Sequence, residues 1–240
     1  MARSRSALTG VSLVIAHGPL SQTAHGASAG EVAADYIRRL IFDGVLGQDE
    51  HVRQEDIAEQ LGISRSPVRE AVIALSHEGW LVTEPHRGAF VHGLDEMSVR
   101  DHYEVLGFVY GLTARRATER QSPDGLADLM TAQKALRKAE TPDSVRSANA
   151  AYLWQLFLLA DSSRLSSLQA SLGRNIVPGN FFELVPGAAS AQKRGTAAVT
   201  KAIRLRDAST AETECQKLMR RHGERVISLL TTRRLIHEGK

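Results

Sequence analysis

The chain has 240 residues, 42% of them hydrophobic and 24% charged, so it is long enough for two domains with packed cores. No apolar run approaches the roughly 20 residues that a membrane-spanning helix needs, so we expect no membrane segment. The formal net charge is only +3, and residues 31–94 hold six arginines against eleven acidic residues, which excludes bulk charge as a source of binding to a polyanion.

Residues 1–29 show neither helical nor strand periodicity, and they are rich in Ser, Ala, Gly and His. Arg3 and Arg5 precede an apolar run at 11–16 that is too short for the core of a secretion signal. We therefore predict a disordered N-terminal arm over residues 1–29.

Residues 57–75, IAEQLGISRSPVREAVIAL, predict two helices joined by a tight turn. Gly62 ends the first helix, because glycine adopts turn geometry at little cost. Ser64 or Ser66 can cap the second helix, and Pro67 suits its first turn, where the missing N–H is not needed. Each helix has one apolar face, formed by Ile57, Ala58 and Leu61 in the first and by Val68, Val72 and Leu75 in the second.

Arg65 and Arg69 lie four residues apart on a different face of the second helix, so both guanidinium groups project the same way. This is the layout of a helix-turn-helix whose second helix enters the DNA major groove. The alternative is an ordinary αα-hairpin, but such a hairpin does not explain the paired outward arginines.

Two β-prone runs, at 81–83 and 89–91, follow the end of the second helix at Gly79 and Trp80. The turn between them, EPHRG, has a cationic tip at Arg87. A helix-turn-helix followed by a β-hairpin is a winged helix, and Arg87 would then lie where a wing meets the DNA backbone or minor groove. The pattern therefore predicts a DNA-binding domain.

This stretch resembles the GntR family of bacterial transcription regulators over about residues 31–92. The resemblance is carried by a first helix at 31–43, by EDIAEQLGISRSPVREAVIALSHEGWLV and by EPHRGAFV. It implies that DNA is contacted by Ser64, Arg65, Ser66 and Arg69 on the second helix and by His86, Arg87 and Gly88 at the wing tip.

Two positions depart from the family pattern. Gln48-Asp49 stands where the family usually has Pro-Gly before the second helix of the domain. Glu55 stands where some members use an arginine, and Arg53 is the residue that can substitute for it. We therefore add Arg53 to the predicted DNA contacts and make no prediction of the operator sequence.

From Asp95 onward the helical period dominates, and it predicts helices at 96–120, 124–139, 143–160, 164–176, 188–205 and 208–234. The predicted fold is mostly α. A winged helix-turn-helix domain at 30–94 precedes an all-α helical-bundle domain at 95–240, which we expect to bind a ligand and to dimerise.

The bundle resembles the FadR subfamily, whose effector domains are called FCD domains, through fragments such as DHYEVLGFVYGLTARRATER. Many members hold a metal with an Asp and a His four residues apart and two further His. Aligned by register, these positions fall at Ala150, Trp154, Thr196 and His222. A Zn²⁺-type ion needs three or four protein ligands, so we predict neither a metal nor another cofactor.

An arginine and a glutamate that are common in the subfamily correspond to Leu106 and Tyr110. Such a site favours a ligand with an apolar body and one or two hydrogen-bonding groups, and fatty acids and acyl thioesters are the first candidates. The alternative is a closed core in which Trp154 fills the former metal cavity, which would leave a DNA-binding regulator or architectural protein without an effector. The predicted effector site is Leu106, Tyr110, Trp154, Thr196 and His222.

No Ser-His-Asp elbow, phosphate loop, HExxH or CxxC motif occurs, so we do not expect an enzyme. The single cysteine, Cys215, allows no internal disulfide and fits a reducing cytoplasm. We predict a cytoplasmic, homodimeric transcription regulator that acts as a repressor. Its expected partners are a two-fold symmetric double-stranded DNA operator and a small, partly apolar effector.

Overall fold

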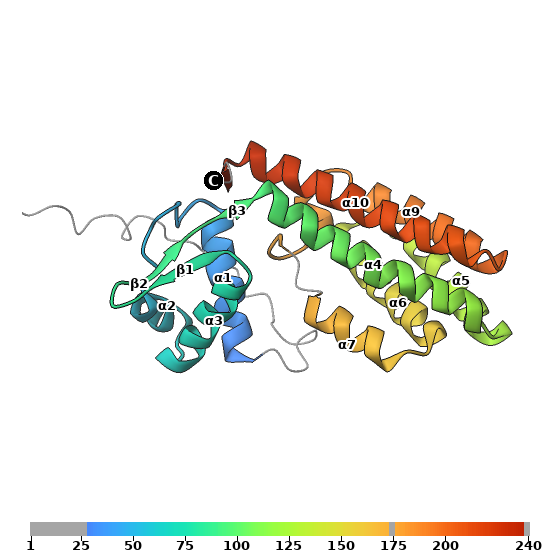
Figure 1. The fold of residues 1–240 in the computed structure, drawn as a ribbon, viewed down its shortest axis with the longest axis horizontal. Helices are drawn as coiled ribbons and strands as arrows, with labels where there is room; N and C mark the ends of the chain where they lie inside the picture. Colours follow the sequence, from blue (N-terminus) through green and yellow to red (C-terminus); the bar gives the residue numbers. More distant parts are fainter. Residues whose placement is uncertain (1–27, 173–175, 238–240) are drawn as a thin grey trace, which may run out of the picture.

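The computed structural model describes residues 28–172 and 176–237 (Figure 1). An N-terminal lobe of short helices and a β-hairpin lies at one end, and a lobe of long helices extends away from it. The predicted fold class is confirmed. Within the described ranges, no helix combines the length and the apolar character that a membrane crossing requires. The predicted arm lies outside the described residues up to residue 27, and Ala29 already belongs to the first helix.

The N-terminal lobe begins with a capped helix. The Ser28 hydroxyl accepts a hydrogen bond from the Glu31 backbone N–H, and the Glu31 carboxylate accepts one from the Ser28 backbone N–H, which together form a capping box. The apolar faces of the first and third helices bury Ile37, Val68 and Leu75 completely. The elements of this lobe are α1 (Ala29–Phe42), α2 (Gln54–Leu61), α3 (Arg65–His77), β1 (Leu81–Glu84) and β2 (Gly88–Val91).

The hairpin of β1 and β2 is antiparallel, with Leu81 opposite Val91. Its turn contains His86 at φ 62° and Gly88 at φ 100°, both in the left-handed region. The positive φ of Gly88 favours glycine, and a Cβ atom there would lie 2.4 Å from Nε2 of His51, so a larger residue would displace the His51 ring.

The long lobe is built around α4 (Glu96–Arg120) and α10 (Ala208–Thr232), which lie side by side (Figure 1). Close packing depends on small residues. A Cβ atom on Gly195 would lie 2.6 Å from the Leu218 side chain, and one on Gly223 would lie 2.9 Å from Tyr103. The other helices of this lobe are α5 (Pro123–Lys138), α6 (Pro142–Ala160), α7 (Ser163–Leu172), α8 (Phe181–Leu184) and α9 (Ala188–Arg204).

The end of the chain joins the two lobes. Arg233, just after α10, donates a hydrogen bond to the Phe42 carbonyl at 3.2 Å, and its guanidinium lies 4.2 Å from the centre of the Phe42 ring. The same guanidinium is 3.7 Å from the Asp43 carboxylate. Beyond it, β4 (Ile236–His237) pairs in parallel with β3 (Leu94–Asp95), the segment that links the lobes. The C-terminus of α10 is thereby attached to the end of α1.

The predicted helices of the second half all occur, with ends that differ by at most four residues. The helix predicted at 164–176 ends at Leu172, and residues 173–175 are not described. The short α8 and the β3–β4 pair were not predicted. They are too brief to carry a periodicity of their own.

Candidate functional site

The turn between α2 and α3 has the geometry that the glycine predicted. Gly62 adopts φ 63°, and its N–H bonds to the Ala58 and Glu59 carbonyls, which ends α2. Ser64 takes the extended conformation of an N-cap residue, and Pro67 lies in the first turn of α3. The Ser64 side chain makes no capping hydrogen bond. Its hydroxyl can therefore serve an outside partner.

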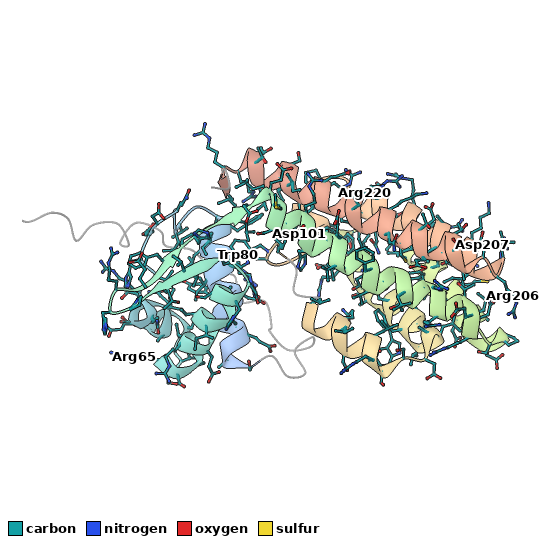
Figure 2. All side chains as sticks on the ribbon, in the orientation of Figure 1. Arg65, Trp80, Asp101, Arg206, Asp207 and Arg220 are labelled. Carbon is teal, nitrogen blue, oxygen red and sulfur yellow. The ribbon has the colours of Figure 1, made fainter. Side chains whose placement is uncertain are left out.

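The predicted DNA-contacting residues of α3 lie together on the surface. Ser64, Arg65, Ser66 and Arg69 are all exposed, whereas Val68, Val72 and Leu75 on the opposite face are at most 3% exposed. Arg65 lies at the end of the lobe that is remote from the long helices (Figure 2). Packing thus holds α3 by its apolar face and presents its first turns to a partner.

The wing lies at the same end of the molecule, as the hairpin in Figure 1 shows. His86 and Arg87 are exposed, and Gly88 is half-buried. Arg87 forms an ion pair with Glu84, and its guanidinium lies 5.3 Å from the centre of the Phe90 ring. These contacts hold the Arg87 cation at the hairpin tip.

One further cation, Arg53, and one acid, Glu55, complete this surface. Arg53 is the exposed N-cap residue of α2. Neither Arg53 nor Arg69 forms an ion pair with any residue that the structure describes. In contrast, Nη1 of Arg65 lies 2.8 Å from Oε1 of Glu55, and both side chains are largely exposed.

Four of the five predicted effector residues, Leu106, Tyr110, Thr196 and His222, are buried in the helical lobe. The prediction for Trp154 is wrong, because this side chain is 66% exposed on the outside of α6 and does not join the other four. It therefore neither lines nor fills the interior.

The physical reason for the Trp154 error is an error of one residue in helical register. On α6, Tyr152 and Leu156 point inward, and Asn149 bonds to α9, whereas Ala150 is exposed like Trp154. One residue corresponds to 100° around a helix. If the alignment is moved one position earlier, the pair that was placed at Ala150 and Trp154 falls instead at Asn149 and Leu153, which are half-buried.

A buried chain of hydrogen bonds connects three helices at this place. Nε2 of His222 on α10 lies 2.7 Å from Oε1 of Gln192 on α9, and Nε2 of Gln192 donates to Oδ1 of Asn149 on α6 at 2.6 Å. Thr196 Oγ1 donates to the Gln192 carbonyl. Neither Gln192 nor Asn149 was among the predicted site residues. The only available signal was the spacing of Gln192, one helical turn before Thr196.

This arrangement defines the state of His222. Because Gln192 Oε1 can only accept, Nε2 of His222 carries the proton, and Nδ1 is a bare acceptor. Nδ1 is buried and has no hydrogen-bond partner among the residues that the structure describes. Burial, and then the nearby charge of Arg225, lowers the pKa of His222 from 6.5 to about 4, so the imidazole is neutral at physiological pH.

These residues do not fit a transition-metal site. Among the described residues, no three histidine, cysteine or acidic side chains come together. The buried cluster offers a single imidazole with two amides and a hydroxyl, and a Zn²⁺-type ion needs three or four strong ligands.

The N-terminal lobe has the architecture of a winged helix-turn-helix DNA-binding domain. Residues 29–91 match the family model described as bacterial regulatory proteins, gntR family. This segment is therefore similar to gntR-type DNA-binding domains. The wider predictions of the FadR subfamily and of an FCD domain remain predictions.

Two curated relatives are similar over part of the chain. An HTH-type transcriptional regulator of Mycobacterium tuberculosis is 31% identical over 116 residues, which are 48% of each chain. The Nta operon transcriptional regulator of Aminobacter aminovorans is 34% identical over 80 residues, 33% of this chain and 38% of that protein. The matched segments thus span about half or less of these relatives.

Solved structures are similar over both lobes. A GntR-family transcriptional regulator of Pseudomonas syringae pv. tomato has a TM-score of 0.51 at 21% identity, covering 86% of this chain and 87% of that one. McbR/YncC of E. coli has a TM-score of 0.57 at 16% identity, covering 87% and 100%. At these identities the likeness establishes the fold alone.

Proposed function

We propose that the protein is a sequence-specific DNA-binding transcription regulator. The carrying observation is the exposed row Ser64, Arg65, Ser66 and Arg69 at the start of α3, with the Arg87 wing tip at the same end of the molecule, on a lobe that matches the gntR model. In helix-turn-helix complexes the first residues of the second helix read base edges, and backbone contacts fix the orientation. The names of the relatives support the same proposal.

Selection from a random-sequence library of double-stranded DNA tests this proposal. We expect the wild-type protein to enrich a two-fold symmetric sequence and the Arg65→Ala/Arg69→Ala variant to enrich none. The matched control is Arg137→Ala/Arg164→Ala, which removes the same charge from exposed positions on α5 and α7. If the wild-type protein enriches no sequence, the proposed function is wrong.

We propose that the regulator is a homodimer, because one recognition helix reads few base pairs and two-fold symmetry doubles the contacts. Helices α4 and α6 pack on each other, and each carries exposed apolar side chains. Phe108 is 64% exposed, Trp154 is 66% exposed and Leu158 is 55% exposed. We propose that these side chains form the face that contacts a second copy. Light scattering should give twice the chain mass of 26.2 kDa. Phe108→Asp/Trp154→Asp should give a monomer, and a wild-type monomer on and off DNA contradicts the proposal.

We propose that the arm (1–29) and DNA-binding domain (30–94) are followed by an effector domain (95–240) that takes a small, partly apolar molecule. The unpartnered Nδ1 of His222 calls for a donor such as a hydroxyl. Arg225, whose charge acts on His222, also lines an open cavity of about 390 Å³ beside α10, together with Arg221 and the acidic Glu224. That volume suits a small ligand, and the two arginines outnumber the one acid in the lining, which favours a carboxylate.

Control of DNA binding by this effector has a physical route. His222 lies on α10 and Arg233 is the residue that caps this helix, about 16 Å further along its axis, where Arg233 contacts the end of α1. We propose that the effector acts along α10 and that the regulator is a cytoplasmic repressor; an E. coli relative, 28% identical over 81 residues, is named a transcriptional repressor.

A thermal-shift screen of fatty acids and acyl thioesters separates this proposal from its alternative, a DNA-binding or architectural protein with a closed core. An effector at a hundredfold excess over Kd stabilises the folded state by about 2.7 kcal/mol. The shift should disappear in Arg225→Gln and persist in Arg137→Gln. Absence of any shift across the panel, with DNA binding intact, favours the closed core.

A further inference from the structure

A carboxylate lies within the surface proposed to face DNA phosphates. Glu55 is in the first turn of α2, its side chain is 69% exposed, and Oε1 is 2.8 Å from Nη1 of Arg65. A negative charge at such a surface repels the DNA backbone and weakens binding. Its presence there therefore calls for a second role that offsets this repulsion. Its ion-pair partner, Arg65, is the first residue of α3.

We infer that Glu55 is a positioning residue that fixes the orientation of Arg65 for base reading and thereby sets sequence specificity. This inference rests on the proposed function. An arginine reads guanine through two parallel hydrogen bonds to O6 and N7, which demand one orientation of the guanidinium plane. The ion pair places Nη1 of Arg65 against Glu55, which favours one orientation of the guanidinium and leaves its other N–H groups for a base.

A purely structural role does not account for the pair. An ion pair between side chains that are this exposed contributes on the order of 0–1 kcal/mol to stability. A carboxylate near the N-terminus of α2 also favours the helix dipole, but Asp56 in the same turn supplies that interaction too. A dipole role predicts a change in stability without any change in base discrimination, so the two roles are separable.

Arg69 provides the contrast within the same surface. It lies one turn further along α3 and forms no ion pair with the described residues. We therefore expect the base discrimination contributed by Arg65 to depend on Glu55, and that contributed by Arg69 to be independent of Glu55.

The test compares Glu55→Gln with the wild-type protein on three kinds of duplex: the sequence enriched by the wild type, its single base-pair variants, and random-sequence DNA. We expect discrimination at one base pair of each half-site to fall roughly tenfold, the scale of one bidentate contact. Affinity for random DNA should rise at the same time, because a negative charge is removed from the surface. Glu59→Gln, which removes the same charge one turn along α2, should leave discrimination unchanged.

A double-mutant cycle with Arg65→Ala, measured at low salt where backbone contacts maintain binding, completes the test. If Glu55 acts through Arg65, Glu55→Gln has no further effect on discrimination in the Arg65→Ala protein. Unchanged discrimination in Glu55→Gln overturns the inference while leaving the proposed function intact. So does an effect that persists without Arg65, since Glu55 would then accept a hydrogen bond from a base directly. Failure of the wild type to enrich any sequence overturns both.

Discussion

The buried imidazole of His222 makes the stability of the protein depend on pH in a predictable direction. Its pKa is about 4 in the folded state and 6.5 as an ordinary histidine, so the unfolded chain binds a proton more readily at intermediate pH. Stability therefore rises with pH between these two values and is lost as the pH falls through them. The contribution is fully present only above the unfolded pKa.

The magnitude follows from the two pKa values. As the pH falls from about 7 to about 5, the unfolded state takes up a proton that the folded state does not. The free energy of unfolding therefore decreases by about 2 kcal/mol. Urea unfolding followed by circular dichroism at the two pH values measures this loss. His102, whose pKa burial also lowers, contributes in the same direction.

The variant His222→Gln isolates the contribution of His222. Glutamine can still donate to Gln192 but does not titrate, so the loss between the two pH values should shrink by about 2 kcal/mol relative to the wild type. His102→Gln is the matched control and should leave most of the His222 contribution in place. An equal loss in the wild type and in His222→Gln refutes the claim that this imidazole is buried and neutral.

Three further outcomes follow from the structure. Arg87→Ala should weaken DNA binding with little loss of sequence discrimination in a binding titration, because a wing mainly contacts the backbone. Gly195→Ala places a Cβ atom 2.6 Å from Leu218 and should cost about 1–3 kcal/mol in urea unfolding, partly recovered by Leu218→Val. Arg233→Ala removes the cation–π contact and the hydrogen bond to Phe42 and should cost about 1 kcal/mol in the same assay.

The helix-turn-helix was predictable from local chemistry. Gly62 specifies a left-handed turn, and the spacing of Val68, Val72 and Leu75 specifies the buried face, which in turn exposes Arg65. Each of these features depends on neighbours within one or two helical turns. For that reason the sequence pattern and the structure agree closely there.

The interior of the helical lobe was less predictable. Helix α6 has apolar residues on all sides, with Tyr152 and Leu156 inward and Trp154 and Leu158 outward, so its pattern does not define which face is buried. The His222–Gln192 hydrogen bond depends on how two helices dock rather than on any local pattern. The β3–β4 pair joins segments far apart in the chain, and two-residue strands leave no signal.

The binding of a selected duplex by the wild type, Arg65→Ala and Arg69→Ala, followed by fluorescence anisotropy, tests the central claim most directly. Each variant should lose binding to the selected duplex by about 1–3 kcal/mol, with urea unfolding unchanged because both side chains are exposed. Wild-type affinity in both variants would contradict the assignment of α3 as the recognition helix.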